Sequence, residues 1–479
     1  MMLQSNNRRK FLRSSALGLT IPAFMQDALA QKNLQRRLDW EAFKVTTQYD
    51  SLLNAIRRMK ANTNPADPNS WEYWTAVHIN YCPHNVPYFY AWHRGYLYYF
   101  ERQLKTVSGD SRLALPYWDY YASPALPAEF TNASTTNPLY VERVNTDVRQ
   151  ALTLAPFSPT LTNFPRGMVN AFEPSLESAP HNPVHDIIGN TMATMRSPVD
   201  PIFWLHHANV DRLWVAWVAA GGGRTMPSKK SAYWSGNHVY ASTLSMARSA
   251  TYDTRSVLQY SYQNESLPTR LPLAQLSPAK IHRVQAEPGQ RLATLPPLGT
   301  FPVTAARATS ETRFSIGGAR RIGLDERSIS AQLPVSSSHW KALQEIMRGN
   351  AASVPGSSKQ YRSVVLVLDE VELSEGGRKG GFYYQVYLNI PADGGPSSTP
   401  ISVLIGTLGA FQVSGASHHG HGSVQLAYPI GRKLAGASSL QVGLASVSFV
   451  RVNGSKAPRG PAIGIGEVRI ELATEDSQS

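Results

Sequence analysis

Histidines are the residues whose type and spacing in this sequence are most suited to chemistry. They form two groups, and the second starts with an i,i+4 pair that would point both imidazoles from one face of a helix. In chain order the members are His78, His84 and His93, then His181, His185 and the pair His206-His207. Imidazole suits copper, zinc, iron or nickel, and the lack of matching carboxylates argues against magnesium and calcium. Two such groups predict a pair of metal ions that share an exogenous ligand.

The elements that must position these histidines are predicted to be helices. Apolar residues recur at helical spacing at Leu52, Ile56 and Met59, and residues 90–105 and 203–218 are apolar-periodic and free of proline. A chance gathering of core or surface histidines would be the better interpretation for any one of them. It is a poor interpretation for six that cluster within apolar helical segments.

Beyond residue 266 the pattern changes. Residues 267–309 are rich in proline and predict a linker, and residues 310–479 contain β-branched and aromatic runs between Gly, Pro and Ser clusters. The clearest runs predict strands at 364–368, 382–388 and 447–452. We therefore predict an α + β multidomain protein. A mainly helical domain over residues 31–266, with a four-helix bundle core, is followed by a C-terminal antiparallel β-sandwich.

The first thirty residues predict an export signal. The twin arginine Arg8-Arg9 precedes a modestly apolar stretch, and Ala28-Leu29-Ala30 offers an A-x-A cleavage site. A basic tail ahead of an amphipathic helix is the weaker alternative. We expect residues 1–30 to be a twin-arginine signal peptide that directs the chain to the periplasm or the extracellular space. Because no later segment has about twenty consecutive apolar residues, stable membrane insertion is not expected.

The net charge of +13 would suit an anionic partner such as nucleic acid, a membrane surface or a cell wall. However, no Lys/Arg-rich run follows the N-terminus, and the sequence contains no basic and aromatic nucleic-acid motif, so nucleic-acid binding is not expected. Cys82 is the only cysteine. Since one cysteine cannot form an internal disulfide, its role must lie elsewhere.

Both histidine segments resemble the copper-binding signatures of the tyrosinase, catechol oxidase and molluscan haemocyanin family. The likeness covers roughly residues 34–265, and beyond the histidines it extends to residues 115–120, 172–177, 200–214 and 260–262. The C-terminal residues are similar, more loosely, to the C-terminal domain of plant polyphenol oxidases. One departure is Gly95, where the family usually has proline; it removes no ligand.

The resemblance implies two copper ions, O2 as co-substrate and a small phenol as substrate. It assigns the first copper to His78, His84 and His93, and the second to His181, His185 and His207. His206 is then expected to pack or hydrogen-bond nearby. Asp211, one helical turn after His207, is placed to orient a ligand imidazole, with a helix-surface salt bridge as the alternative. The loop that carries Met192 and Met195 is expected at the pocket rim. A copper chaperone is left open as a further partner, and no oligomeric state is implied.

The resemblance also implies catalytic residues. In the family a Glu/Asn pair at the positions of Glu177 and Asn182 is proposed to hold a water that accepts the phenol proton. This implies tyrosinase activity, the ortho-hydroxylation of monophenols and the oxidation of o-diphenols to o-quinones. Cys82 has the C-x-H spacing at which some members carry a thioether, here to His84. The C-terminal domain is expected to cover the site as a lid that keeps the enzyme latent.

Three alternatives remain open from the sequence. The first is a catechol or o-aminophenol oxidase that lacks monophenolase activity. The second is a haemocyanin-like oxygen-binding protein, against which the export signal and the absence of internal repeats argue. The third is a dizinc hydrolase, which the absence of metal-ligand Asp and Glu motifs disfavours.

Overall fold

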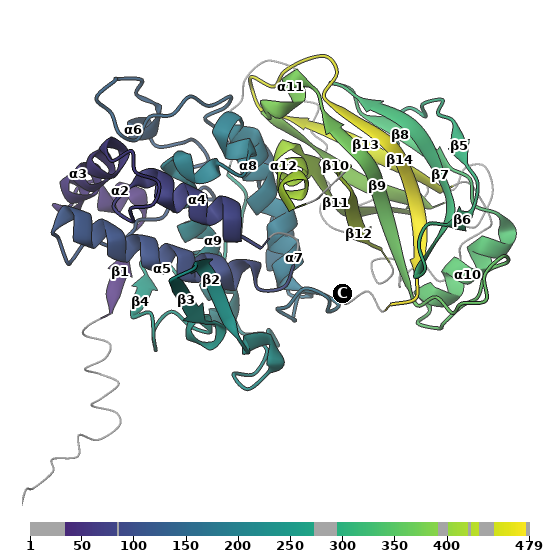
Figure 1. Ribbon diagram of the computed structural model, residues 1–479, viewed down its shortest axis with the longest axis horizontal. Helices are drawn as coiled ribbons and strands as arrows, with labels where there is room; N and C mark the ends of the chain where they lie inside the picture. The colour runs from purple at the N-terminus through teal and green to yellow at the C-terminus, as the bar shows by residue number, and fades with distance from the viewer. Residues whose placement is uncertain are drawn as a thin grey trace, which may run out of the picture.

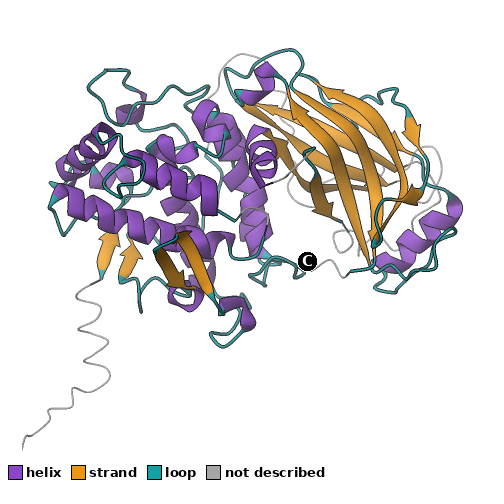
Figure 2. Ribbon diagram, viewed as in Figure 1, coloured by secondary structure: helices purple, strands orange, loops and turns teal. Residues whose placement is uncertain are grey.

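The computed structural model describes residues 34–83, 86–272, 295–390, 401–419, 423–430 and 445–475. Within them the chain forms two parts that lie side by side (Figure 1). We call residues 34–272 the helical part and residues 295–475 the sheet part, since helices dominate the first and strands the second (Figure 2). The predicted signal peptide over residues 1–30, the predicted ligand His84 and residues 273–294 of the predicted linker lie outside the described residues.

The helices of the helical part follow the predicted pattern. The longer ones are α3 (Gln48–Ala61), α4 (Trp71–Tyr81), α5 (Phe89–Ser108), α8 (Asn182–Ile188) and α9 (Ile202–Ala219), and the shorter ones are α2 (Trp40–Phe43), α6 (Ala128–Thr131) and α7 (Phe172–Leu176). The helices predicted over residues 90–105 and 203–218 are confirmed as α5 and α9. α4 begins after Ser70, whose side chain accepts the N–H of Glu72. α5 ends at Gly109, whose φ of 75° is a conformation that glycine favours.

Aromatic rings hold α4, α5 and α9 together. The rings of Phe100 in α5 and Trp204 in α9 are stacked, with 3.4 Å between centroids and 10° between planes. Trp71 of α4 meets both rings edge-on, and all three side chains are buried. Burying a large apolar side chain stabilises a fold by about 1.5–3 kcal/mol. The three helices that carry His78, His93 and the pair His206-His207 are therefore packed in one core.

A buried ionic cluster ties the two ends of the helical part together. The strands β1 (Gln35–Arg37) and β4 (Tyr260–Tyr262) pair in parallel beside Asp211 of α9. The Asp211 carboxylate accepts hydrogen bonds at 2.6 Å from both β4 tyrosine hydroxyls and from Nε of Arg94, and Arg37 lies 3.8 Å away. The expectation that Asp211 orients a ligand imidazole is therefore wrong, because Arg94 and the two tyrosines occupy its carboxylate.

The sheet part contains two antiparallel sheets that share one core. In hydrogen-bonding order the first sheet is β11 (Ile401–Gly409), β10 (Phe382–Ile390), β13 (Ala445–Asn453) and β8 (Ile329–Leu333), and the second is β12 (Leu426–Pro429), β9 (Ser363–Leu373), β14 (Ile463–Ala473), β7 (Arg313–Leu324) and β5 (Val303–Thr304), with β6 (Arg307–Ala308) also paired to β7. Side chains from both sheets, among them Tyr384, Phe449, Leu368 and Ile470, form one buried cluster. The three predicted strands are confirmed within β9, β10 and β13. Outside the sheets lie α10 (Ser337–Met347) and α11 (Glu375–Arg378).

One further helix of the sheet part, α12 (Ala410–His419), lies against α8 of the helical part (Figure 1). At its first turn the N–H of Phe411 donates to Oδ1 of Asp186 at 2.8 Å. The N–H of Gly381 donates to the backbone carbonyl of the same aspartate at 2.7 Å. Gly409 leaves room for this contact, because a Cβ at that position would lie 2.2 Å from Oδ2 of Asp186. The two parts are thus joined through buried polar groups as well as apolar ones.

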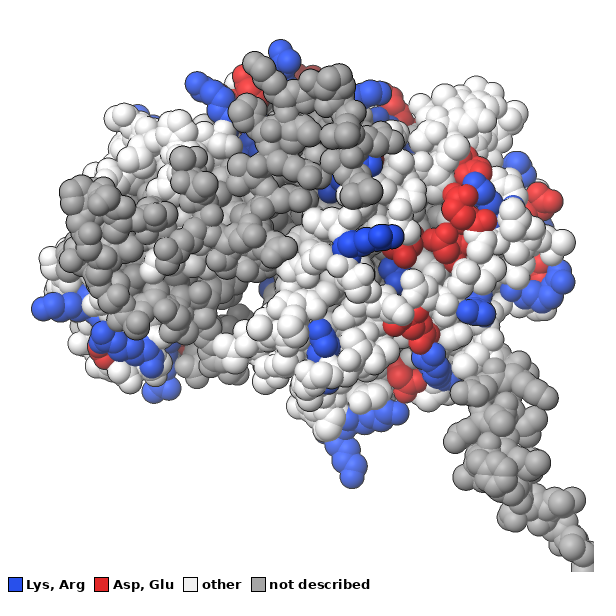
Figure 3. Space-filling view, turned by 180° about the vertical axis from the view of Figure 1, so that it is seen from behind, with Lys and Arg blue, Asp and Glu red and all other residues white. Residues whose placement is uncertain are grey.

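The surface shows charges of both signs. On the face in Figure 3, Lys and Arg side chains stand in small separate groups, several of them beside Asp or Glu. Ion pairs between exposed side chains of the sheet part include Arg327–Asp325 and Arg348–Glu345. Among the described residues, no helix is both long enough and apolar enough to cross a membrane.

Candidate metal centre

The first histidine cluster lies where α4 and α5 meet. His78 of α4, Cys82 after its last turn and His93 of α5 bring candidate ligand atoms within 4.8 Å of one another, and all three side chains are buried. Sγ of Cys82 lies 3.6 Å from Nε2 of His93. Burial raises the pKa of the Cys82 thiol well above its usual value. Because an imidazole ligates a metal in its neutral form whereas a thiol must first lose its proton, the better donors here are the two imidazoles.

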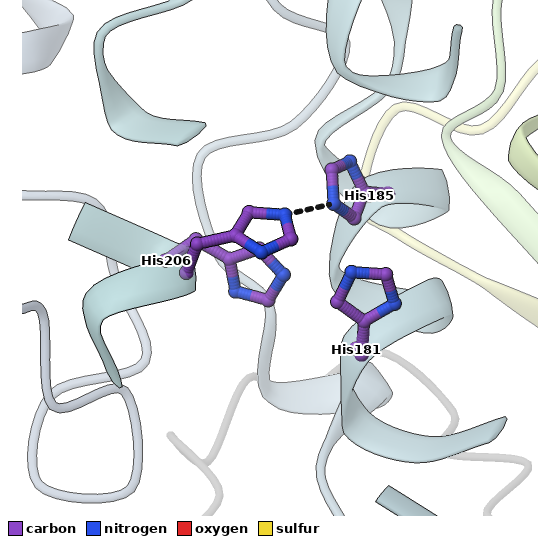
Figure 4. Close-up of side chains that lie close together, drawn as sticks. His181, His185 and His206 are labelled. Atoms are coloured by element: carbon purple, nitrogen blue, oxygen red, sulfur yellow. Dashed lines mark hydrogen bonds between the residues drawn. The ribbon is translucent and has the colours of Figure 1, made fainter. Parts of the chain in front are cut away.

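The second cluster lies where α8 and α9 meet. His181, which ends the π-helical turn Glu177–His181, joins His185 of α8 and the α9 pair His206 and His207, all buried and again with candidate ligand atoms within 4.8 Å. Figure 4 shows the rings of His181, His185 and His206 converging from the two elements. Nε2 of His185 and Nε2 of His207 are 3.3 Å apart. An all-imidazole set of this kind suits copper or zinc.

Hydrogen bonds fix which ring nitrogen is available to a metal in four of the histidines. The bonds join Nδ1 of His78 to the carbonyl of Met195 (2.9 Å), Nδ1 of His93 to the carbonyl of Phe89 (2.9 Å), Nδ1 of His185 to the carbonyl of Met192 (2.8 Å) and Nδ1 of His181 to Oδ1 of Asn182 (2.8 Å). Since a carbonyl oxygen can only accept, Nδ1 carries the proton in each ring. The lone pair therefore lies on Nε2, which is the atom that a metal would bind.

The charge state of the second cluster agrees with this assignment. Burial lowers the pKa of His181 to about 3, and it lowers the pKa of His185 and of His207 well below the usual value. These rings are neutral at pH 7, as metal ligation requires. Nε2 of His181 is buried and has no hydrogen-bond partner among the described residues. An orphaned, unprotonated nitrogen in this position fits a metal ligand.

The two clusters face each other. The rings of His93 and His207 are stacked, with 4.2 Å between centroids and 12° between planes, although each comes from a different cluster. One small buried volume therefore holds donors for a pair of ions, and copper fits them in number, type and protonation. The structure brings together His78, His93, His181, His185 and His207. His84, predicted as the third ligand of the first copper, is not described.

His206 packs beside the candidate ligands, as expected, with its ring stacked on that of His181 at 5.4 Å between centroids. The structure places His206 within the second cluster, and neither of its ring nitrogens has a hydrogen-bond partner among the described residues. The side chains of Met192 and Met195, in the loop that was expected at the pocket rim, are both buried. Their backbone carbonyls accept hydrogen bonds from candidate ligands: the carbonyl of Met192 from Nδ1 of His185, and that of Met195 from Nδ1 of His78.

The predicted catalytic pair lies beside the second cluster, and each member already has a partner. Oδ1 of Asn182 accepts the Nδ1–H of His181, so this amide fixes a candidate ligand. The carboxylate of Glu177 pairs with the guanidinium of Arg166. Sequence reasoning did not single out Arg166, because it lies in a loop and carries no motif.

A residue of the sheet part covers the centre. The ring of Phe411 is stacked on His185, with 4.0 Å between centroids and 11° between planes, and meets His181 edge-on at 5.7 Å. Phe411 is buried in this position. No local pattern in the sequence marks it, because its contact partners lie more than two hundred residues earlier in the chain.

Known proteins share these features. Residues 61–151 and 127–220 match the common central domain of tyrosinase. A tyrosinase of Hahella sp. (strain CCB-MM4) is 30% identical over 234 residues, which cover 35% of this chain and 50% of that protein. A chloroplastic polyphenol oxidase of Malus domestica is 28% identical over 282 residues, which cover 46% and 47%. The chain thus spans about half the length of these curated relatives.

The likeness in fold extends further along the chain. A solved structure titled as a recombinantly expressed latent aurone synthase (polyphenol oxidase) is similar with a TM-score of 0.50 at 20% identity, over 92% of this chain and 90% of that one. Fold and site together define an α and β metalloprotein with a buried pair of histidine clusters. Residues 61–220 carry the features of the common central domain of tyrosinase, and the chain is similar to the tyrosinase and polyphenol oxidase family. This is a family of dicopper oxidoreductases with a coupled copper pair and O2 as the usual co-substrate.

Proposed function

We propose that this chain is a copper-dependent phenol oxidase that ortho-hydroxylates monophenols and oxidises o-diphenols to o-quinones. One observation carries the proposal: two facing clusters of buried imidazoles, in which backbone carbonyls and an amide take the Nδ1 protons. Copper held by the five described histidines and His84 would bind O2 and supply the oxidising chemistry. The printed names of the relatives, tyrosinase and polyphenol oxidase, support the same class of reaction.

The residues of this chain would manage the phenol proton. A phenol must lose its proton before its oxygen can bind a metal, and a carboxylate close to the site can accept that proton through a water. Glu177 lies four residues before His181 in the sequence, and Asn182 directly follows His181. Both side chains are buried. We assign the water to these two side chains, with the Asn182 amide also orienting His181. This assignment favours a tyrosinase over a catechol or o-aminophenol oxidase.

The sheet part supports a latent state. We propose that residues 31–266 form the catalytic domain around a four-helix core and that residues 310–479 form a β-sandwich lid. The lid would exclude substrate while Phe411 covers His185. The stacking of these two rings supports the lid. Residues 267–309 would link the two domains and offer a site for cleavage. Export through a signal peptide at residues 1–30 remains part of the proposal.

Copper content and phenol turnover test the proposal. Two copper ions per chain and a strong near-ultraviolet band after addition of hydrogen peroxide are expected, together with turnover of both p-cresol and 4-methylcatechol once the lid is cleaved. Turnover of the catechol alone would favour the catechol oxidase. The peroxide band without turnover of either would favour the haemocyanin-like oxygen carrier. Zinc in place of copper, with no band after copper reconstitution, would overturn the oxidase proposal.

A further inference from the structure

The ion pair between Arg166 and Glu177 lies at the edge of the metal centre. One terminal nitrogen of the guanidinium contacts Oε2 of Glu177. The Glu177 side chain is 4% exposed, whereas that of Arg166 is 24% exposed, so the carboxylate is inside and the arginine reaches it from the surface side. A buried carboxylate needs such a partner, because an uncompensated buried charge is costly.

Arg166 is itself held in place by its loop. The neck of the loop is closed by the N–H of Asn163, which donates to the carbonyl of Asn170 at 3.2 Å. The N–H of Arg166 donates to Oε2 of Glu173 at 2.8 Å, and Oε1 of Glu173 accepts the hydroxyl of Tyr233 at 3.1 Å. The backbone of Arg166 is therefore fixed to α7, the helix that leads directly into Glu177. A guanidinium on a fixed backbone can hold a carboxylate in one orientation.

Other groups around Glu177 would disturb its orientation without this partner. The negative charge of Glu177 contributes, after burial, to the raised pKa of the Tyr90 hydroxyl, so this hydroxyl lies near the carboxylate and stays protonated. The hydroxyl of Tyr90 is buried and has no hydrogen-bond partner among the described residues. If a neutral residue replaced Arg166, the Glu177 carboxylate could turn toward the Tyr90 hydroxyl and away from the metal centre.

We propose that Arg166 is a positioning residue for the phenol proton acceptor, holding Glu177 toward the metal centre. The inference rests on the proposed function, in which Glu177 and Asn182 hold the accepting water. A monophenol is a weaker acid than the matching catechol and depends more on that acceptor. Arg166 should therefore matter more for hydroxylation of monophenols than for oxidation of diphenols. Because its guanidinium is already paired with Glu177, it should not act by binding an anionic group of the substrate.

The test compares Arg166→Gln, Arg166→Lys and the unchanged full chain, each loaded with copper and cleaved in the same way. For Arg166→Gln we expect kcat on p-cresol to fall about 10- to 100-fold, a typical cost of a misplaced proton acceptor. Turnover of 4-methylcatechol should stay within about twofold, since the metal ligands are untouched. Arg166→Lys should recover part of the loss because it keeps the charge. Arg112→Gln, which breaks an exposed pair with Asp110 in the helical part, is the matched control and should change neither rate.

Two further measurements separate the proposal from its rivals. Crystal structures of the metal-free variants should show Glu177 turned away in Arg166→Gln and retained in Arg166→Lys. With 4-hydroxyphenylpropionic acid as substrate, a rise in KM that p-cresol does not show would mean that Arg166 binds a substrate anion, and would overturn the proposal. Equal losses on monophenol and diphenol at full copper occupancy, or no loss on either, would also overturn it. A complete lack of p-cresol hydroxylation in the unchanged chain would instead refute the tyrosinase proposal, and this inference with it.

Discussion

The ring of Phe411 lies parallel to the imidazole of His185, with 4.0 Å between centroids and 11° between planes. Phe411 belongs to α12 of the sheet part and His185 to α8 of the helical part. Aromatic pairs of this kind contribute about 0.5–1.5 kcal/mol beyond their buried area. This one contact would therefore add a modest bias toward docking of the proposed lid.

Replacing Phe411 by alanine should raise the activity of the uncut chain. The variant removes the ring that covers His185 while leaving the hydrogen bond between its backbone N–H and Asp186. We expect turnover of 4-methylcatechol by uncut Phe411→Ala to rise several-fold toward that of the cleaved enzyme. Val413→Ala, in the sheet-part core, is the control for a general loss of packing. If both variants lose stability and neither gains turnover, Phe411 does not restrict access.

Cys82 should carry a thioether to His84 in the mature protein. Its sulfur is buried beside His93. Burial raises the pKa of the thiol, so an unlinked Cys82 would be an unreactive thiol in the folded chain. The bond would replace S–H and a ring C–H, with O2, the proposed co-substrate, accepting the two electrons and two protons. Peptide mapping of the copper-loaded chain should therefore find the two residues cross-linked, with the mass deficit of two hydrogens. Recovery of Cys82 fully alkylated after denaturation would contradict the link. Cys82→Ser, which cannot form it, provides the unlinked reference.

Glu173 should make stability depend on pH. Burial raises the pKa of this carboxyl from 4.5 to about 7. Between these values the folded chain holds a proton that the unfolded chain releases, so this contribution to stability is complete below pH 4.5 and is lost as pH rises through about 7. At 1.36 kcal/mol per pKa unit the loss is at most about 3 kcal/mol. The free energy of unfolding, measured with urea from about pH 5 to about pH 8, should therefore fall less steeply for Glu173→Gln than for the unchanged chain. Parallel curves would contradict the prediction.

Asp211 should be important for stability. It is buried and accepts hydrogen bonds from Arg94 and from both tyrosines of β4. Asp211→Asn leaves the buried arginine without its counter-charge, which should cost about 3–5 kcal/mol in urea unfolding. Asp325→Asn, which breaks an exposed pair with Arg327, should cost about 1 kcal/mol or less. Similar losses in the two variants would mean that the buried cluster is no stronger than a surface pair.

The elements that could be predicted from the sequence are those whose local pattern agrees with their environment. Helices α5 and α9 have long apolar periods, and β9, β10 and β13 have unbroken β-branched or aromatic runs. β7 and β14 were missed because glycines interrupt them, and glycine weakens a strand pattern. Gly317 in β7 is required by space, since a Cβ there would lie 2.0 Å from the carbonyl oxygen of Pro334. Such a contact becomes visible only once the strands are packed.

The site could be predicted where a motif carries the chemistry. Histidine spacing and family resemblance identified His93 and His207, which the structure brings into contact. Spacing alone was misleading for Asp211, because one helical turn places two residues on one face without deciding what else lies there. Arg166 and Phe411 could not be predicted, since an ion pair made from a loop and a contact between the two parts leave no local pattern.

The buried cluster at Asp211 has a consequence for how the lid would leave. It closes the helical part on itself: Arg37 and Tyr262, 225 residues apart, are joined by a hydrogen bond ahead of the linker. A cut in the linker would therefore leave the catalytic half intact and convert the lid from a tethered segment into a free ligand. Its effective concentration would drop from the millimolar range typical of short tethers to that of the bulk solution. Dilution alone would then shift the nicked protein toward its open form, so its activity per molecule should depend on protein concentration.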